Sequence, residues 1–163
     1  MKLINLILIV LLFVIATSCA ILKDPEITKR ENIDNYSFVV LPKTNSLTSE
    51  TGGVYGNQYG VYGGSTTKEM NPGQVIEGIF LKRGLVSTDS VNTENKDKTL
   101  IVKYGESGKR NVAGGLGGYT LEVTIALISA KTNSIVYSCV AEGQGETEVD
   151  DIREAIHRCL SGL

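Results

Sequence analysis

The sequence has few of the residues on which metal centres, nucleic-acid interfaces and disulfide-rich scaffolds depend. Its 163 residues include 3 Cys, 1 His and no Trp, too few for a Cys/His zinc cluster, a haem site or a densely cross-linked fold. With 16 Lys and Arg against 18 Asp and Glu, the net charge is −2, and no basic excess is left to neutralise many phosphates. We therefore expect no metal, no cofactor and no nucleic-acid partner.

Long hydrophobic runs are also scarce, and the most prominent one is at the N-terminus. Met1 and Lys2 precede an apolar run over residues 3–15, which is too short by itself to cross a ~30 Å hydrocarbon layer and has the form of a secretory signal. The run ends in Ala16-Thr17-Ser18-Cys19, which resembles the lipobox of bacterial lipoproteins. The resemblance implies cleavage after Ser18 and acylation of Cys19 with fatty acids such as palmitate.

Two other interpretations of this segment stay open. Ala16 and Ser18 also suit an ordinary signal peptidase, and the stretch from Leu3 to Leu22 is just long enough to span a membrane uncleaved. Lipidation is the working hypothesis, and acyl chains on Cys19 would anchor the protein stably, because two chains already suffice. Ala20 after Cys19 is compatible with outer-membrane sorting. We therefore expect a lipid-anchored protein of the cell envelope, at the outer membrane, facing the periplasm or the surface.

The composition predicts three regions along the chain. Residues 1–18 form the signal peptide, and residues 19–35, which mix both charge signs, form a lipid-anchored linker that we expect to be a solvated stalk. Residues 36–163 have the length of one modest domain. Within them, residues 52–64 are predicted to be a Gly/Tyr-rich loop.

Hydrophobic periodicity predicts the elements of the domain. Strands are expected over residues 36–41 and 99–104, with a turn at 105–108, and a β-hairpin is expected from the alternating residues 119–127 and 135–141. A helix should begin at the N-cap Asn71 and end at Gly84, and a second should cover residues 149–160. The predicted fold is α+β, a two-layer α/β sandwich with a mostly antiparallel sheet and two helices on one face.

A family resemblance covers Tyr36 to Leu163. The segments that carry it are YSFVVLP, IEGIFLKRGLV, KTLIVKY, YTLEVTIALISAKTNSIVY and DIREAIHRCL. They resemble uncharacterised bacterial domain-of-unknown-function lipoproteins, whose layout is similar to the small α/β domains of curli-secretion and penicillin-binding-protein-activator lipoproteins. Departures include Asn133 where such hairpins often have Gly, Tyr137 where Trp is common, and the Gly/Tyr insertion. The resemblance implies a two-layer fold and an envelope role, and it brings no catalytic residues.

Three tyrosines in the glycine-rich segment form the candidate binding site. Tyr55, Tyr59 and Tyr62 could offer flat, amphipathic faces to a glycan or to an envelope protein, since Tyr gives a large contact area at low entropic cost. The alternatives are a self-packed loop or a small extra hairpin.

The two remaining cysteines are candidates for a disulfide. Cys139 shares a strand face with Tyr137, and Cys159 lies on the apolar stripe of the helix expected to cover that sheet. In an oxidising periplasm the two could be bridged, and the alternative is a pair of buried free thiols.

No catalytic motif accompanies the single histidine. His157 lies on the face of the last helix opposite the apolar stripe, and no Ser or Cys stands near it in a motif such as G-x-S-x-G. We therefore expect a non-catalytic binding or assembly module anchored to the membrane. The alternatives are an envelope hydrolase, or a structural subunit of an envelope complex that pairs through an exposed sheet edge.

Overall fold

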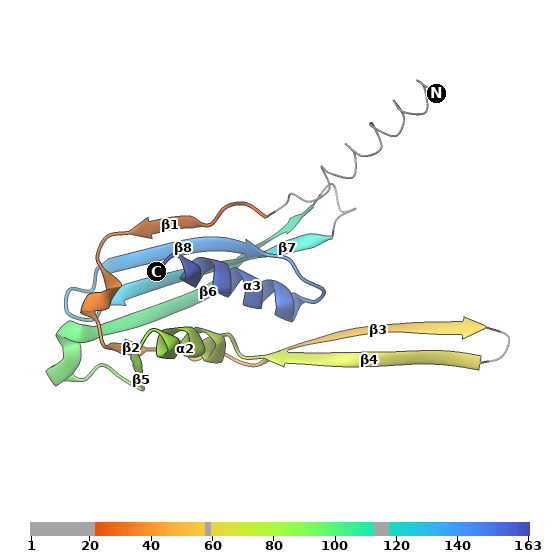
Figure 1. Ribbon diagram of the computed structural model, residues 1–163, viewed down its shortest axis with the longest axis horizontal. Helices are drawn as coiled ribbons and strands as arrows, with labels where there is room; N and C mark the ends of the chain where they lie inside the picture. Colours follow the sequence, from red (N-terminus) through yellow and green to blue (C-terminus); the bar gives the residue numbers. More distant parts are fainter. Residues whose placement is uncertain (1–21, 58–59, 113–117) are drawn as a thin grey trace, which may run out of the picture.

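The computed structural model describes residues 22–57, 60–112 and 118–163 (Figure 1). Its elements in chain order are β1 (Glu26–Lys29), β2 (Phe38–Val40), β3 (Leu47–Asn57), β4 (Gly60–Met70), α2 (Pro72–Lys82), β5 (Val86–Thr88), β6 (Thr99–Asn111), β7 (Tyr119–Ser129), β8 (Ile135–Gly143) and α3 (Glu148–Ser161). Two 3₁₀ turns, Ile33–Asn35 and Thr93–Lys98, complete them. The fold is α+β.

The main sheet has six strands in the order β1-β8-β7-β6-β2-β5. Strands β1, β8, β7 and β6 pair antiparallel, and β2 runs parallel to both β6 and β5. The sheet is therefore mixed, with a mostly antiparallel body. Strands β3 and β4 form a separate two-stranded sheet.

The hairpin of β7 and β8 confirms the alternation in the sequence. Leu121, Val123, Ile125 and Leu127 are buried, whereas the residues between them are partly exposed. The turn between the strands places Asn133 at φ 55°, in the left-handed region. Asn tolerates that conformation better than other non-glycine residues, so the turn does not require a glycine.

Strand β6 is longer than expected. The turn predicted at residues 105–108 is wrong, because β6 continues to Asn111 and stays paired with β7. The glycines are accommodated by a register shift between Glu106 and Gly108, an irregularity that lets one extra residue fit without ending the strand.

The described part of the predicted linker is folded, so the expectation of a solvated stalk over residues 19–35 is corrected from Leu22 onward. Residues Glu26–Lys29 form the edge strand β1, in register with β8. The backbone N–H groups of Arg30 and Glu31 both donate to the carbonyl of Val136, and Ile33 is buried in the core. Pairing with a distant strand, which local composition does not reveal, accounts for the difference.

Residues 52–64, predicted to be a loop, lie instead in the hairpin of β3 and β4, apart from residues 58–59, which are outside the described part. In Figure 1 this hairpin extends well beyond the body of the domain. Its backbone pairing is continuous from Leu47 opposite Met70 to Asn57 opposite Gly60. The alternative of an extra hairpin is therefore the one the structure shows, and we call this element the arm.

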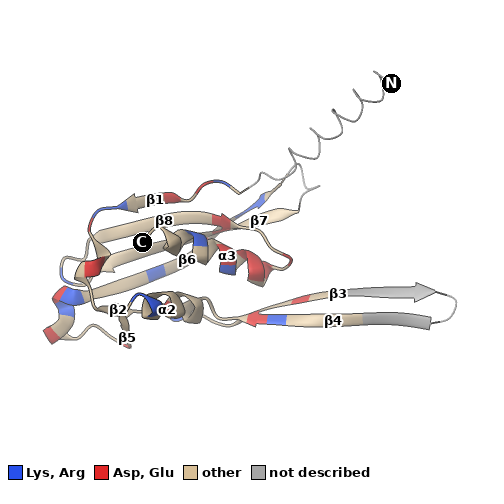
Figure 2. Cartoon of the chain, viewed as in Figure 1, with Lys and Arg blue, Asp and Glu red and all other residues tan. Residues whose placement is uncertain are grey.

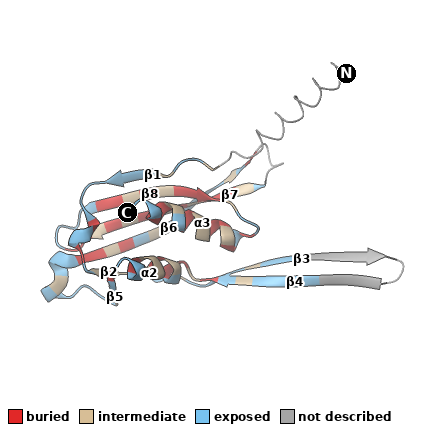
Figure 3. Cartoon of the chain, viewed as in Figure 1, coloured by how far each residue is buried: buried red, intermediate tan, exposed pale blue. Residues whose placement is uncertain are grey.

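The core is closed mainly by α3, which packs against β7 and β8. Figure 3 shows buried residues concentrated along these strands. The side chains buried between the sheet and the helix include Val123, Ile125, Leu127, Ile152, Ile156 and Leu160. Each such side chain contributes ~1.5–3 kcal/mol relative to exposure, so this contact dominates the stability of the domain.

Each of the two helices begins with an N-cap residue whose side chain accepts a backbone hydrogen bond. The Asn71 side chain accepts from the N–H of Gln74, Pro72 occupies the first turn, and Gly84 after the last turn has φ 83°, as the sequence predicts. Thr147 caps α3 by accepting from the N–H of Asp150. No helix within the described residues has the length and apolar character needed to cross a membrane.

Candidate functional site

The arm extends out of the otherwise compact body of the domain (Figure 1). Each of its strands has 11 residues, which at ~3.4 Å per residue corresponds to roughly 35 Å. From Thr51 to Thr67 its sequence carries no charged residue. An isolated hairpin is marginally stable in water, because its backbone edges and both faces are exposed to solvent. The arm therefore needs support at its base or from a partner.

The base of the arm is fastened to α3 by an ion pair. The Lys68 ammonium on β4 donates to Asp150 Oδ2 at 2.7 Å and to Glu146 Oε2 at 3.2 Å. The bond to Lys68, followed by one from Thr147, lowers the pKa of Asp150. Figure 2 shows the acidic start of α3 beside the charged base of β4. This contact ties the arm to the helix that closes the core.

Strand β3 is tied to the same helix. The backbone N–H of Val149, one of the first-turn donors that α3 cannot satisfy internally, donates to Ser49 Oγ at 3.3 Å. Leu47 packs against the core, and its partner in register, Met70, is buried. Both strands are thus fixed at the point where they leave the body.

A further set of hydrogen bonds at the base of the arm joins Thr44, which leads into β3, to Asn71, which follows β4. Asn71 Nδ2 donates to the Thr44 carbonyl at 2.9 Å, and the Thr44 hydroxyl donates to Asn71 Oδ1 at 2.6 Å. The N–H of Gly73 donates to the same hydroxyl at 2.9 Å. A Cβ at Gly73 would lie 2.8 Å from Thr44 Oγ1, so the close approach requires glycine. The two ends of the arm therefore leave the body as a unit.

Two of the three candidate tyrosines fall on the distal half of the arm. Tyr55 on β3 and Tyr62 on β4 are directly opposite each other in the strand register. Their side chains, and Tyr59 altogether, lie outside the described residues, as does Cys19. The register thus brings together two of the three residues that the sequence singled out as a binding site.

The two candidate cysteines are joined in a disulfide. It links Cys139 on β8 to Cys159 on α3, with a Cα–Cα distance of 5.5 Å, and both residues are fully buried. Beside it, the Tyr137 hydroxyl donates a hydrogen bond to the Cys159 carbonyl. Tyr137 is fully buried in the core, and its hydroxyl is satisfied by the helix backbone. A bond of this kind forms in oxidising compartments.

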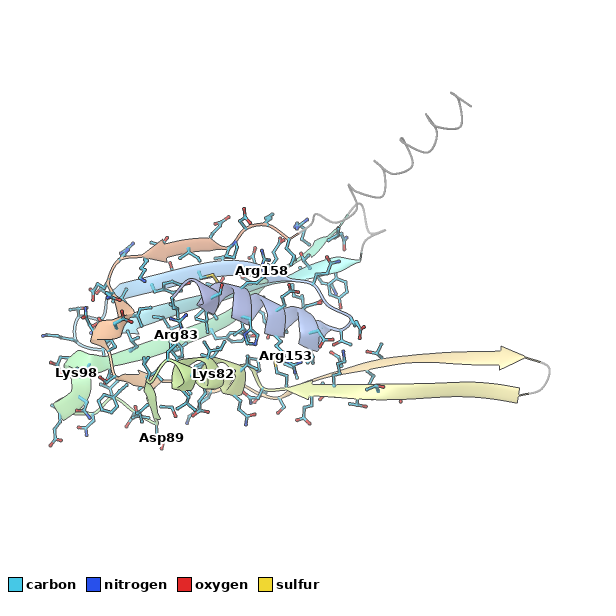
Figure 4. All side chains as sticks on the ribbon, viewed as in Figure 1. Lys82, Arg83, Asp89, Lys98, Arg153 and Arg158 are labelled. Atoms are coloured by element: carbon cyan, nitrogen blue, oxygen red, sulfur yellow. A yellow bond between two sulfur atoms is a disulfide. The ribbon has the colours of Figure 1, made fainter. Side chains whose placement is uncertain are left out.

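Sequence reasoning missed a cluster of charged residues around Glu142 on β8. Its carboxylate accepts from Arg110 Nε at 2.8 Å and from Arg110 Nη2 at 2.6 Å, and it also accepts from the backbone N–H of Lys23 at 3.1 Å. The Arg110 bonds, with help from Lys23, hold the pKa of Glu142 at about 2 despite its burial. From the other side, Arg158 on α3, labelled in Figure 4, donates to the carbonyls of Glu142 and Lys23. Only the strand register could have revealed this cluster.

A polar hollow of about 220 Å³ lies beside the start of α3, with Tyr119, Gln144 and Asp151 among its lining residues. Asp151 is 3% exposed, and its carboxylate accepts from the N–H of Gly145. Burial raises the pKa of Asp151 more than that hydrogen bond lowers it. The carboxylate holds the segment before α3 against the helix, which is a structural role.

The only histidine of the sequence is exposed on α3, as the helical pattern predicts. The structure therefore does not provide the arrangement that would favour a hydrolase, a buried His157 beside a carboxylate and a hydroxyl. Within residues 22–57, 60–112 and 118–163, no three His, Cys, Asp or Glu side chains are grouped so as to hold a metal ion.

Comparison with known proteins adds no relative. No protein-family model matches the chain, and a search of curated proteins finds no significant match.

Proposed function

We propose that this protein is a lipid-anchored module of the cell envelope whose function is non-catalytic binding or assembly, with the arm as its binding element. The observation that carries the proposal is the arm itself: a roughly 35 Å hairpin that extends from the body and is fixed only at its base. A rigid body that presents such an element is typical of recognition rather than of catalysis, because the arm offers edges and flat faces but no enclosed site.

The envelope location is supported by two independent features. The N-terminal apolar run ends at Cys19 in a lipobox-like sequence, and acyl chains at that residue would hold the domain at a membrane. The disulfide between Cys139 and Cys159 suits the oxidising compartment that a secretory signal leads to.

The body serves as a platform in this proposal, a two-layer α/β sandwich with both helices on one face of the main sheet. The contacts of α3 with β7 and β8, together with those between α2 and α3, support this arrangement. Arg83, which follows α2, donates to the carbonyls of Leu160 and Leu163 at the end of α3, so the two helices are fastened side by side (Figure 4).

The partner of the arm is proposed to be an envelope protein or a glycan. The outer edges of β3 and β4 form no pairing in the described part of the chain, so a strand of a partner protein could add to either edge. Tyr55, Tyr59 and Tyr62 would provide the apolar contact for such a protein or stack on a sugar. The same free edges favour the second candidate, a structural subunit of an envelope complex.

Whole-cell crosslinking tests the proposal. The wild type should recover a partner that a Tyr55→Ser/Tyr59→Ser/Tyr62→Ser variant recovers poorly, while the melting temperature of that variant stays nearly unchanged, because the arm contributes little to the core. The control replaces the exposed Thr48, Thr66 and Thr67 with Ser, which alters the arm but leaves its tyrosines in place. Equal recovery by the wild type and the tyrosine variant would contradict the proposal.

A further inference from the structure

The first described residues are held rigidly against the body. The N–H of Lys23 donates to Glu142 Oε2 at 3.1 Å, and the carbonyl of Lys23 accepts from Arg158 Nη2 at 2.7 Å. Both backbone groups of this residue are therefore bound, one by β8 and the other by α3. Three residues further on, the chain enters β1 and pairs with β8. The described chain is thus held against the body from Lys23 onward, and only two residues separate Lys23 from β1.

This clamp leaves a very short tether to the proposed lipid. Lys23 comes four positions after Cys19, with three residues between them, and a fully extended chain over four residue steps spans at most ~14 Å. Strand β6, with 13 residues, is roughly 43 Å long at ~3.3 Å per residue. Arg110, near the end of this strand, shares the Glu142 carboxylate with Lys23. One end of the sheet is therefore held near the acyl chains, and the other lies roughly three tether lengths away.

We propose that this end of the sheet is a membrane-contact surface that rests on phospholipid headgroups. We call it the anchored end and define it as Lys23, Lys109–Asn111 and Gly118–Tyr119. The inference rests on the proposed acylation of Cys19. It assigns the domain a fixed orientation on the membrane, which we call its posture. In this orientation the opposite end, the 3₁₀ turn Thr93–Lys98, is directed away from the bilayer.

The side chains of the anchored end suit a headgroup layer. The Lys109 ammonium lies 3.4 Å from the centroid of the Tyr119 ring. Lysine and tyrosine both combine an apolar body with a polar tip, and both are favoured where hydrocarbon meets water. This pair can therefore approach the lipid surface without burying a charge.

Charge attraction is not what holds the surface in place. Asp24 and Glu26 lie close to Lys23, and the buried Glu142 offsets Arg110, so the anchored end has no strong positive excess. The short tether and the clamp determine the posture instead. Salt, which screens exposed charges within ~10 Å at 0.1 M, should therefore leave the posture unchanged.

The orientation of the domain also determines where the arm lies relative to the membrane. Figure 1 shows the arm extending on the same side of the body as the end of β6 and the start of β7. Its uncharged stretch from Thr51 to Thr67 can approach headgroups without the cost of burying a charge. The unpaired edges of a lone hairpin keep it out of the hydrocarbon core, because their N–H and C=O groups would be unsatisfied there. The partner of the arm is therefore expected at the membrane surface.

Lipid-borne quenching of a fluorophore tests this inference. The acylated full chain is placed in phosphatidylethanolamine/phosphatidylglycerol vesicles whose headgroups carry a nitroxide, with a dye on Asn111→Cys or on Lys96→Cys. Both positions are exposed, and labelling is selective because Cys139 and Cys159 are bonded and buried. Quenching should be several-fold stronger at position 111 than at position 96, at low and at high salt alike.

Two further variants test the cause of the posture. Inserting about ten Gly/Ser residues between Ala20 and Lys23 should abolish most of the difference between the two positions, since such a linker is flexible. Arg158→Ala should reduce the difference because it releases the Lys23 carbonyl, whereas Arg153→Ala, on the same helix but bonded to Asp150, should not.

The outcomes separate this inference from the function on which it rests. Vesicle flotation reports anchoring, and a protein that does not float with the vesicles would overturn the anchoring and the posture together. A protein that floats but shows equal quenching at positions 111 and 96, or stronger quenching at 96, would overturn the posture alone. A difference that survives the Gly/Ser insertion would also overturn it, because the tether would not be its cause.

Discussion

Cys139 in β8 and Cys159 in α3 are joined by a disulfide within the fully buried contact between the main sheet and its covering helix. The bond closes a loop with a sequence separation of 20 residues. It links the two elements that the core already holds together, so its main effect is on the unfolded chain, which it keeps from expanding fully.

Loss of this bond should destabilise the domain without unfolding it. The chain-entropy relation gives about 3 kcal/mol for a loop of this size. Urea unfolding of the wild type with and without reductant should show a free energy of unfolding lower by about that amount when the thiols are reduced. A Cys139→Ala/Cys159→Ala variant should show no response to reductant. A wild type equally stable in both conditions would contradict the structural role of the bond.

The Glu142 cluster should make the domain sensitive to acid. The pKa of Glu142 is lowered from 4.5 to about 2 in the folded state, chiefly by Arg110. Since the folded pKa is the lower one, the ion pair stabilises the fold fully above pH 4.5, and this stabilisation is lost as the pH falls toward 2. Its size is about 2 kcal/mol once solvent screening at the partly exposed Arg110 is considered.

A pH series of unfolding measurements checks this expectation. Glu142→Gln should be less stable than the wild type at neutral pH, and the difference should shrink as the pH is lowered through the acidic range. Glu94→Gln, on the exposed 3₁₀ turn, controls for the general effect of removing one carboxylate. A constant difference between wild type and Glu142→Gln at every pH would show that the pair is not the cause.

Gly143 should not tolerate a side chain. It is the last residue of β8, and a Cβ there would overlap the backbone carbonyl oxygen of Asp151 in α3. Because neither strand nor helix can move without opening the core, Gly143→Ala should cost about 3 kcal/mol or more of unfolding free energy. Gly105→Ala in β6, where nothing lies within 4 Å of the added carbon, should have little effect in the same denaturation assay. Similar losses at both sites would contradict the close packing of α3 on β8.

The ion pairs of Lys68 should hold the base of the arm in place and contribute little to the stability of the body. Lys68→Ala removes the bonds to Asp150 and Glu146, so amide hydrogen exchange should become faster in the lower part of β3 and β4. The melting temperature should hardly change, because the core is not involved. Lys82→Ala at the end of α2 is the matched control. Unchanged exchange in the arm of the Lys68 variant would show that the ion pair does not hold it.

Elements with a clear hydrophobic period could be predicted from the sequence, and those that depend on distant pairing could not. The alternation of residues 119–127 and 135–141 is set by burial of one sheet face, which a sequence displays directly. Strand β1 is short, charged and exposed along its length, so only its register with β8 defines it. The arm is rich in glycine, which disfavours strands, so the sequence predicts a loop there and leaves a small hairpin only as an alternative.

The candidate sites, too, were predictable where they depend on local pattern and not where they depend on distant pairing. Cys139 and Cys159 could be proposed as partners because each lies on a predictable apolar face, yet their pairing depended on the register of β8 and the placement of α3. Glu142 and Arg110 are 32 residues apart, and nothing local marks them as partners. The Lys23 clamp depends on Glu142 in β8 and on Arg158 in α3, so the short length of the proposed membrane tether could be inferred only from the structure.

Intact-mass analysis of the protein purified from membranes tests the central claim most directly. The account predicts a chain that begins at Cys19 and carries the added mass of fatty acyl groups on that residue. A chain that begins at another residue, retains residues 1–18, or carries no acyl group at Cys19 would contradict it.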